Sequence, residues 1–100
     1  MRPIHLASLD KTRPVLILTR EQVRPFIKSI TVAPITSTIR GLSTEVLVGR
    51  INGLDHDSVV SCDNVTTVPG STIGRLIGYL KPEQEAELAH AIAAAYDLDL

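Results

Sequence analysis

Short apolar runs separated by polar turns occupy the first two thirds of the chain. The continuous run 14–19 (PVLILT) is typical of a central strand buried on both faces. Residues 45–51 alternate in polarity, and Asn52-Gly53 then supplies the residues that a tight hairpin turn needs. Four to six strands are predicted in this way, over residues 3–8, 14–19, 30–35 (with a bulge or edge at Pro34), 45–51 and 58–63, with 64–68 as a continuation beyond a bulge.

Helical patterns are fewer. Residues 20–28 are predicted to form a turn or short helical excursion that Pro25 interrupts, and residues 70–78 a short helical piece. The clearest helix begins at Pro82, with glutamates in its first turns and an apolar stripe at 3.6-residue spacing. The elements together predict a mainly β protein with α, a small antiparallel barrel with a C-terminal helix packed on it. The predicted stripe consists of Leu88, Ala89, Ile92, Ala93 and Tyr96.

Length and composition are those of one globular domain over residues 1–100, with 44% hydrophobic and 21% charged residues. No apolar run is long enough to span a bilayer, and we see no secretory signal, so we expect a cytoplasmic protein. The single cysteine, Cys62, excludes an internal disulfide framework and a multi-cysteine zinc site, and we expect it in the core.

Charge is divided unevenly although the net value is only −1. Residues 1–40 carry seven basic and two acidic side chains, a net +5, whereas residues 41–100 carry three basic and nine acidic ones, a net −6. This asymmetry suggests a cationic face for a polyanion, although solvated surface charge would give the same count. The chain has only three aromatic residues, which counts against a nucleic-acid reader that stacks bases on aromatic rings.

Three residue pairs with polar side chains lie at predicted strand ends and are the candidates for binding or catalysis. In Arg13-Pro14, proline fixes the backbone where a guanidinium, which is well suited to clamp a phosphate, leaves the loop. In Thr36-Ser37, two hydroxyls end an apolar strand, and in Asp63-Asn64 a carboxylate follows one. Each pair also has a purely structural interpretation. The arginine can be an ordinary surface residue, the two hydroxyls can hydrogen-bond to the backbone of a turn, and the aspartate can stabilise a turn. His56 lies between two aspartates, but adjacent side chains do not converge, so no metal site is predicted there.

The succession LDKTRPVLILT, TVAPITS, EVLV, NGLDHDSVVSCDNVTTVP and IGRLIGYL before a C-terminal helix resembles the MazF/PemK family over nearly the whole chain. These are toxins of bacterial type II toxin–antitoxin systems. The resemblance implies an SH3-like (MazF/CcdB-like) barrel, a homodimer and a cognate MazE-like antitoxin. It also implies an endoribonuclease that needs no metal or other cofactor and cuts single-stranded RNA at short sequences. In that chemistry the 2′-OH attacks the adjacent phosphorus and leaves 2′,3′-cyclic phosphate and 5′-OH ends.

The resemblance also assigns roles to residues. Arg13 matches the family's phosphate-facing catalytic arginine, and Thr36 the threonine that positions the scissile phosphate. Asp63 matches an acidic position that some members use as a base, and the base here stays open between Asp63, His56 and water. The charge count and the motif neighbours suggest further RNA-binding candidates, which are Lys11, Arg24, Lys28, Ser37, Arg40 and Asn64.

Two departures and one rival qualify this interpretation. Only Lys11 and Thr12 separate SLD from Arg13, where many members carry a longer loop that shapes RNA binding. Thr66-Thr67 stands where an arginine–threonine pair is common. The rival is a CcdB-like poison of DNA gyrase, which shares the fold but acts by binding a protein. This chain has no tryptophan and retains Arg13 and Thr36, which favours the ribonuclease.

Overall fold

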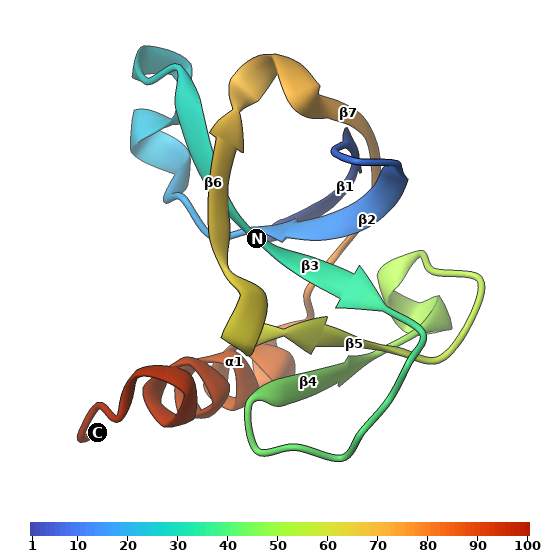
Figure 1. The fold of residues 1–100 in the computed structure, drawn as a ribbon, viewed down its shortest axis with the longest axis vertical. Coiled ribbons are helices and arrows are strands. Elements are labelled where there is room, and N and C mark those ends of the chain that lie inside the picture. The colour runs from blue at the N-terminus through green and yellow to red at the C-terminus, as the bar shows by residue number, and fades with distance from the viewer.

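Seven short strands form one strongly curled antiparallel sheet, and a single α-helix packs against one end of it (Figure 1). The computed structural model describes residues 1–100. The curl makes a half-barrel, so the predicted mainly β fold with a C-terminal helix is confirmed. The elements are β1 (Pro3–Ser8), β2 (Thr12–Ile17), β3 (Ser29–Thr36), β4 (Glu45–Val48), β5 (Ser58–Ser61), β6 (Thr66–Pro69), β7 (Ile73–Tyr79) and α1 (Pro82–Tyr96), with short 3₁₀ turns η1 (Glu21–Phe26), η2 (Arg50–Asn52), η3 (Cys62–Asn64) and η4 (Gly70–Thr72).

Strand β3 organises the sheet because it changes partner along its length. The strand order is β4-β5-β3-β2-β1-β7, and β6 also pairs with β3. The first half of β3 pairs with β6, while Ile35 and Thr36 at its end pair with β5. Pro34, which cannot donate a backbone hydrogen bond, lies between these two partners. The end of β3 therefore meets β5 and the turn that follows it.

Strand β2 separates two hydrophobic clusters, as the PVLILT run predicts. Val15, Leu16 and Ile17 are all buried. Leu16 belongs to a cluster of 12 residues that includes residues of α1, whereas Val15 and Ile17 belong to a cluster of six inside the curl. Alternate side chains of a strand point to opposite faces, so one continuous apolar run serves both cores.

Two local predictions were only partly right. The short helical piece predicted within residues 70–78 is limited to the 3₁₀ turn η4, and the rest of the segment forms β7, which pairs with β1. Gly78 lies against the backbone of Asn52, which a larger residue would prevent. The link between β4 and β5 is not a tight Asn-Gly turn, because η2 intervenes and the side chain of Asn52 is buried. Gly53 nevertheless has the positive φ that the motif indicates, at 89°.

Helix α1 presents a face slightly different from the predicted stripe. Leu88 and Ala93 are buried as expected, but Ala89 and Tyr96 are exposed, and Ala91 is buried in their place. The reason is Gln84, whose buried side chain anchors the first turn of the helix.

The anchor of α1 is a buried pair of amide side chains. The Asn52 Nδ2 donates to the Gln84 Oε1 at 2.7 Å and to the Tyr79 carbonyl at 2.9 Å. The Gln84 Nε2 donates to the carbonyl of Leu47 at 3.1 Å. These bonds tie the helix start, β4, η2 and the end of β7 together, and they satisfy polar groups whose burial would otherwise be costly. The chain contains no helix with the length and hydropathy that crossing a bilayer requires.

Candidate active site

A polar pocket of about 490 Å³ lies where the start of β2, the end of β3, the β3–β4 loop and η3 meet. We call it the Arg13 pocket. It brings together five of the residues that the sequence singles out, namely Arg13, Thr36, Arg40, Asp63 and Asn64. The other lining residues are Pro34, Thr38, Leu42, Glu45 and Ser61.

The register of β2 and β3 explains why Arg13 and Thr36 share this pocket. Val15 pairs with Pro34 in the antiparallel ladder. Beyond this pair, two more residues along each strand lead to Arg13 and Thr36 on the same face, and both side chains line the pocket. The two residues belong to different motifs, 23 positions apart in the sequence. The fold therefore joins a guanidinium and a hydroxyl at one strand pair.

Arg13 has hydrogen-bonding capacity that the chain itself does not use. Its Nη2 lies 3.3 Å from the Oδ1 of Asp10, which is an exposed ion pair, and such pairs are weak. Its Nε is buried and has no hydrogen-bond partner. A buried donor without a partner is uncommon, and an arginine fork is matched to the oxygens of a phosphate. Arg13 is thus equipped to bind an anion in the pocket.

The η3 turn contributes a carboxylate and an amide to the wall of the pocket. The Asp63 Oδ2 accepts a hydrogen bond of 2.6 Å from the hydroxyl of Thr44. The Asn64 Nδ2 donates to the hydroxyl of Ser61 at 2.9 Å. Asp63 and Asn64 are exposed, and the second carboxylate oxygen of Asp63 has no hydrogen bond within the chain.

Cys62, next to this wall, is a core residue as expected. Burial, helped by the nearby charge of Asp63, raises the pKa of the Cys62 thiol to about 11. At pH 7 the thiol therefore stays protonated, and only a thiolate is an effective nucleophile. Cys62 packs in the larger cluster with the strand residues around it.

The remaining candidates lie elsewhere. Ser37 and Lys11 are exposed but do not line the Arg13 pocket, and Lys28 is exposed before β3. His56 lies in the loop before β5, where its carbonyl accepts a hydrogen bond from Ser58. Of the two side chains considered as a base, only Asp63 is in the pocket. No three His, Cys, Asp or Glu side chains group in a way that could hold a metal ion.

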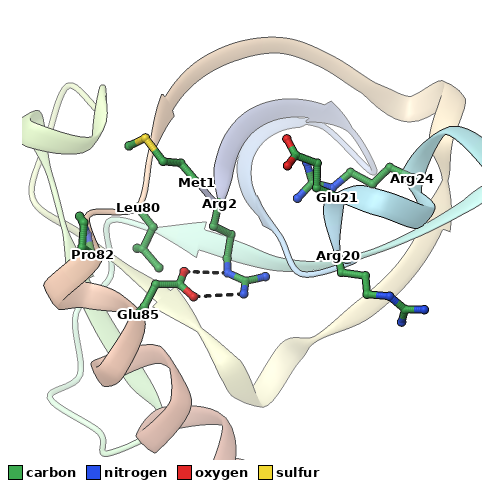
Figure 2. Close-up of a pocket in the computed structure, with 8 residues that line it drawn as sticks. All are labelled: Met1, Arg2, Arg20, Glu21, Arg24, Leu80, Pro82 and Glu85. Atoms are coloured by element: carbon green, nitrogen blue, oxygen red, sulfur yellow. Dashed lines mark hydrogen bonds and ion pairs between the residues drawn. The ribbon is translucent and has the colours of Figure 1, made fainter.

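Arg24 lines a second pocket of about 390 Å³ between the chain start, η1 and α1 (Figure 2). Its Nε donates to the carbonyl of Thr19 at 2.8 Å. In the same pocket Arg2 forms a two-bond ion pair with Glu85, with distances of 2.9 and 3.2 Å, as Figure 2 shows. A further bond of 3.1 Å from Arg2 to the carbonyl of Leu18 ties the first strand, β2 and α1 together. The contacts within this pocket hold elements of the fold together, and neither Arg13 nor Thr36 lines it.

Sequence reasoning missed Thr38, Leu42, Glu45 and Ser61 as pocket residues. The segment 36–43 (TSTIRGLS) is polar and contains a glycine, which is typical of a loop, but nothing in it shows which side chains face inward. Among these residues, Glu45 has the sequence context that best indicates a role in the loop. An acidic side chain directly after a glycine-containing loop can accept hydrogen bonds from the loop backbone.

The protein is thus a small half-barrel with a polar pocket in which an arginine and a threonine can bind an anion. The family model described as the PemK-like, MazF-like toxin of type II toxin-antitoxin systems matches residues 4–96. The chain belongs to this family of toxins, and the resemblance seen in the sequence is confirmed. The CcdB-like alternative is not favoured.

Relatives of known sequence agree with this assignment. Endoribonuclease MazF3 of Mycobacterium tuberculosis (strain H37Rv) is 64% identical over 99 residues, which are 99% of this chain and 96% of the relative. The probable endoribonuclease MazF2 of the same strain is 36% identical over 84 residues, covering 83% of this chain and 82% of the relative.

Solved structures agree as well. The structure of the Mycobacterium tuberculosis toxin MazF-mt6 matches with a TM-score of 0.97 and 63% identity, over 99% of this chain and 100% of that one. A mycobacterial endoribonuclease solved in complex with its cognate antitoxin matches with a TM-score of 0.87, over 98% of this chain and 94% of that one. At 22% identity the second match shows the shared fold alone.

Proposed function

We propose that this toxin cleaves single-stranded RNA at short specific sequences, without a metal ion, by attack of a ribose 2′-OH on the adjacent phosphorus. The enzyme class follows from family membership and from relatives at 64% and 36% identity that are named endoribonucleases. The observation that carries the mechanism is the convergence of Arg13 and Thr36 on one pocket. Because the nucleophile is the 2′-OH, the same reaction on DNA is impossible.

Arg13 stabilises the charge that develops on the phosphate. Its weakly paired Nη2 can donate to a phosphate oxygen in place of Asp10. Donors that are already in place where charge develops supply a large part of enzymatic rate enhancement. Thr36 lies across the ladder and donates its hydroxyl to the same phosphate, while its oxygen accepts the backbone N–H of Thr38 at 3.1 Å. Two residues on adjacent strands thus hold one phosphate.

Asp63 takes the proton in this mechanism. Its free carboxylate oxygen accepts the 2′-OH proton as the bond between the 2′-oxygen and phosphorus forms. The bond from phosphorus to the 5′-oxygen breaks, a water molecule in the open pocket gives that oxygen a proton, and the hydroxide so formed takes back the proton held by Asp63. The products are a 2′,3′-cyclic phosphate and a 5′-OH, and no oxidant, metal ion or further reactant enters the balance.

The test is cleavage of a mixed-sequence single-stranded RNA by purified protein in excess EDTA, with mass analysis of the new ends. We expect 2′,3′-cyclic phosphate and 5′-OH ends at a limited set of sequences. The all-DNA strand of the same sequence is the matched control and should stay intact. Ends carrying 5′-phosphate, activity lost in EDTA, or equal cleavage of the DNA would each contradict the mechanism.

We propose that the toxin acts in the cytoplasm as a homodimer that a cognate MazE-like antitoxin neutralises. Exposed apolar side chains on β4 and η2, Leu47 and Ile51 at 63% and 65% exposure, suit a protein interface. We expect sedimentation to give the mass of a dimer at micromolar concentration. A monomer mass that does not change with concentration would contradict the homodimer.

A further inference from the structure

The β3–β4 loop, residues 37–44, is closed by the side chain of the first residue of β4. The Glu45 Oε1 accepts three backbone hydrogen bonds, from the N–H groups of Arg40 at 3.2 Å, Gly41 at 2.9 Å and Leu42 at 3.1 Å. The backbone N–H of Glu45 also donates to the carbonyl of Leu42 at 3.1 Å. Three consecutive amides that converge on one oxygen form an anion-binding nest, here filled by the chain's own carboxylate.

The nest requires an unusual backbone conformation at its centre. Gly41 has a φ of 73°, in the left-handed region that favours glycine. A Cβ at this position would meet no atom within 4 Å, so the glycine serves the backbone angle and not a close contact. Gly41 and Glu45 together specify one loop conformation in a segment without regular secondary structure.

This loop conformation decides what the Arg13 pocket contains. Thr38, Arg40 and Leu42 are all loop residues, and all three line the pocket together with Glu45. The other end of the loop is fixed by Thr36, whose hydroxyl oxygen accepts the N–H of Thr38. Arg40 is exposed, and its side chain makes no hydrogen bond or ion pair within the chain, so only the loop backbone places its guanidinium.

One oxygen of the Glu45 carboxylate is committed to the loop backbone. The same oxygen accepts all three amide bonds, and these donors offset part of its negative charge. That offset also explains how a carboxylate can border a pocket for a polyanion without repelling it strongly. Through its Oε1, Glu45 therefore serves as a fixed acceptor for the loop.

We propose that Glu45 is a positioning residue, which holds the β3–β4 loop so that Arg40 binds an RNA phosphate next to the scissile one. The role rests on the proposed ribonuclease function and adds a second phosphate contact to it. Arg13 and Thr36 hold the reacting phosphate from the strands. Arg40 binds the neighbouring phosphate from the loop. Glu45 holds the loop in the conformation that places Arg40 for this contact before RNA binds.

The test compares four variants, Glu45→Ala, Glu45→Gln, Arg40→Ala and the Glu45→Ala/Arg40→Ala double variant, in steady-state RNA cleavage. Loss of one charge-assisted contact should raise KM about tenfold in Glu45→Ala and in Arg40→Ala, with kcat within about twofold of the wild type. Glu45→Gln should keep the wild-type KM, because its amide oxygen can accept the same three bonds. The double variant should resemble Arg40→Ala alone, because the two residues act through one contact.

The control is Glu87→Ala, which removes an equal charge from the exposed face of α1 and should leave KM unchanged. An unchanged KM in Glu45→Ala, a Glu45→Gln variant as impaired as Glu45→Ala, or effects that multiply in the double variant would overturn the role. Should Glu45→Ala not fold, Glu45→Asp replaces it, since its shorter side chain cannot reach the three amides, and the same rise in KM is expected. A wild-type protein that leaves RNA intact would overturn the ribonuclease proposal itself, a result distinct from all of these.

Discussion

Substitution of Arg13 by alanine is expected to lower kcat for RNA cleavage by about a thousandfold, the upper range for removing one preorganised donor from a developing charge. The guanidinium is half-buried, with 30% of its side chain exposed, and no other cation stands on β2 or β3 in the pocket to replace it. Arg40 is the remaining cation of the pocket, and it is attached to a loop. The loss should therefore fall mainly on the chemical step.

The measurement is single-turnover cleavage of a defined RNA, with Arg13→Lys and Arg75→Ala beside Arg13→Ala. Lysine keeps the charge but lacks the planar fork, so Arg13→Lys should recover only part of the rate. Arg75 is an exposed arginine of β7 outside the pocket, and its removal should leave kcat unchanged. A higher KM with wild-type kcat in Arg13→Ala would show that Arg13 only binds RNA and does not stabilise the transition state.

The sequence predicts the strand part of this site well and the loop part poorly. Arg13 and Thr36 adjoin apolar runs with a clear strand pattern, and antiparallel pairing of those runs brings the two residues together. The count of charges along the sequence cannot distinguish Arg40 from Arg24, because it does not show which way each side chain points in the folded chain. One of these arginines lines the Arg13 pocket, and the other lies beside Arg2 and Glu85.

Glu45 illustrates what pattern reasoning omits. In the sequence it is a polar residue that begins an alternating strand, and it does begin β4. Its role comes from a φ of 73° at Gly41, which turns three amides toward one oxygen. Hydrophobic periodicity locates strands and helices, but it does not encode how an irregular loop satisfies its backbone donors.

The fold shows the same division. The run 14–19 is predicted as a strand because burial on both faces makes it continuously apolar. The C-terminal helix is predicted because burial on one side leaves a single apolar stripe. The helical piece predicted within residues 70–78 is only the single turn η4, and the remaining residues form the strand β7. Their glycines are explained only by what lies opposite them in space, and this is information that a local pattern lacks.

Gly78→Ala is expected to destabilise the fold by about 3 kcal/mol or more, among the larger single effects for a domain of this size. A Cβ on Gly78 would lie 1.9 Å from the carbonyl oxygen of Asn52 and 2.6 Å from its carbonyl carbon. Both are backbone atoms, so no side-chain rotation relieves the clash. Asn52 is fixed in turn by its buried amide bonds to Gln84 and to the Tyr79 carbonyl. Relief would require β7 to move away from η2, which would strain the hydrogen bonds that anchor α1.

The measurement is the midpoint of thermal unfolding, in which about 3 kcal/mol corresponds to a decrease of at least roughly 10 °C. Gly41→Ala is the matched control, because alanine there meets no atom within 4 Å and suffers only the strain of a positive φ, about 1–2 kcal/mol. The two variants separate steric exclusion from backbone strain, since Gly78 has no positive φ. Equal decreases in the two variants would contradict the close approach of β7 to η2. A larger decrease in Gly78→Ala would show that this contact, which no other residue type permits, closes the sheet onto the helix anchor.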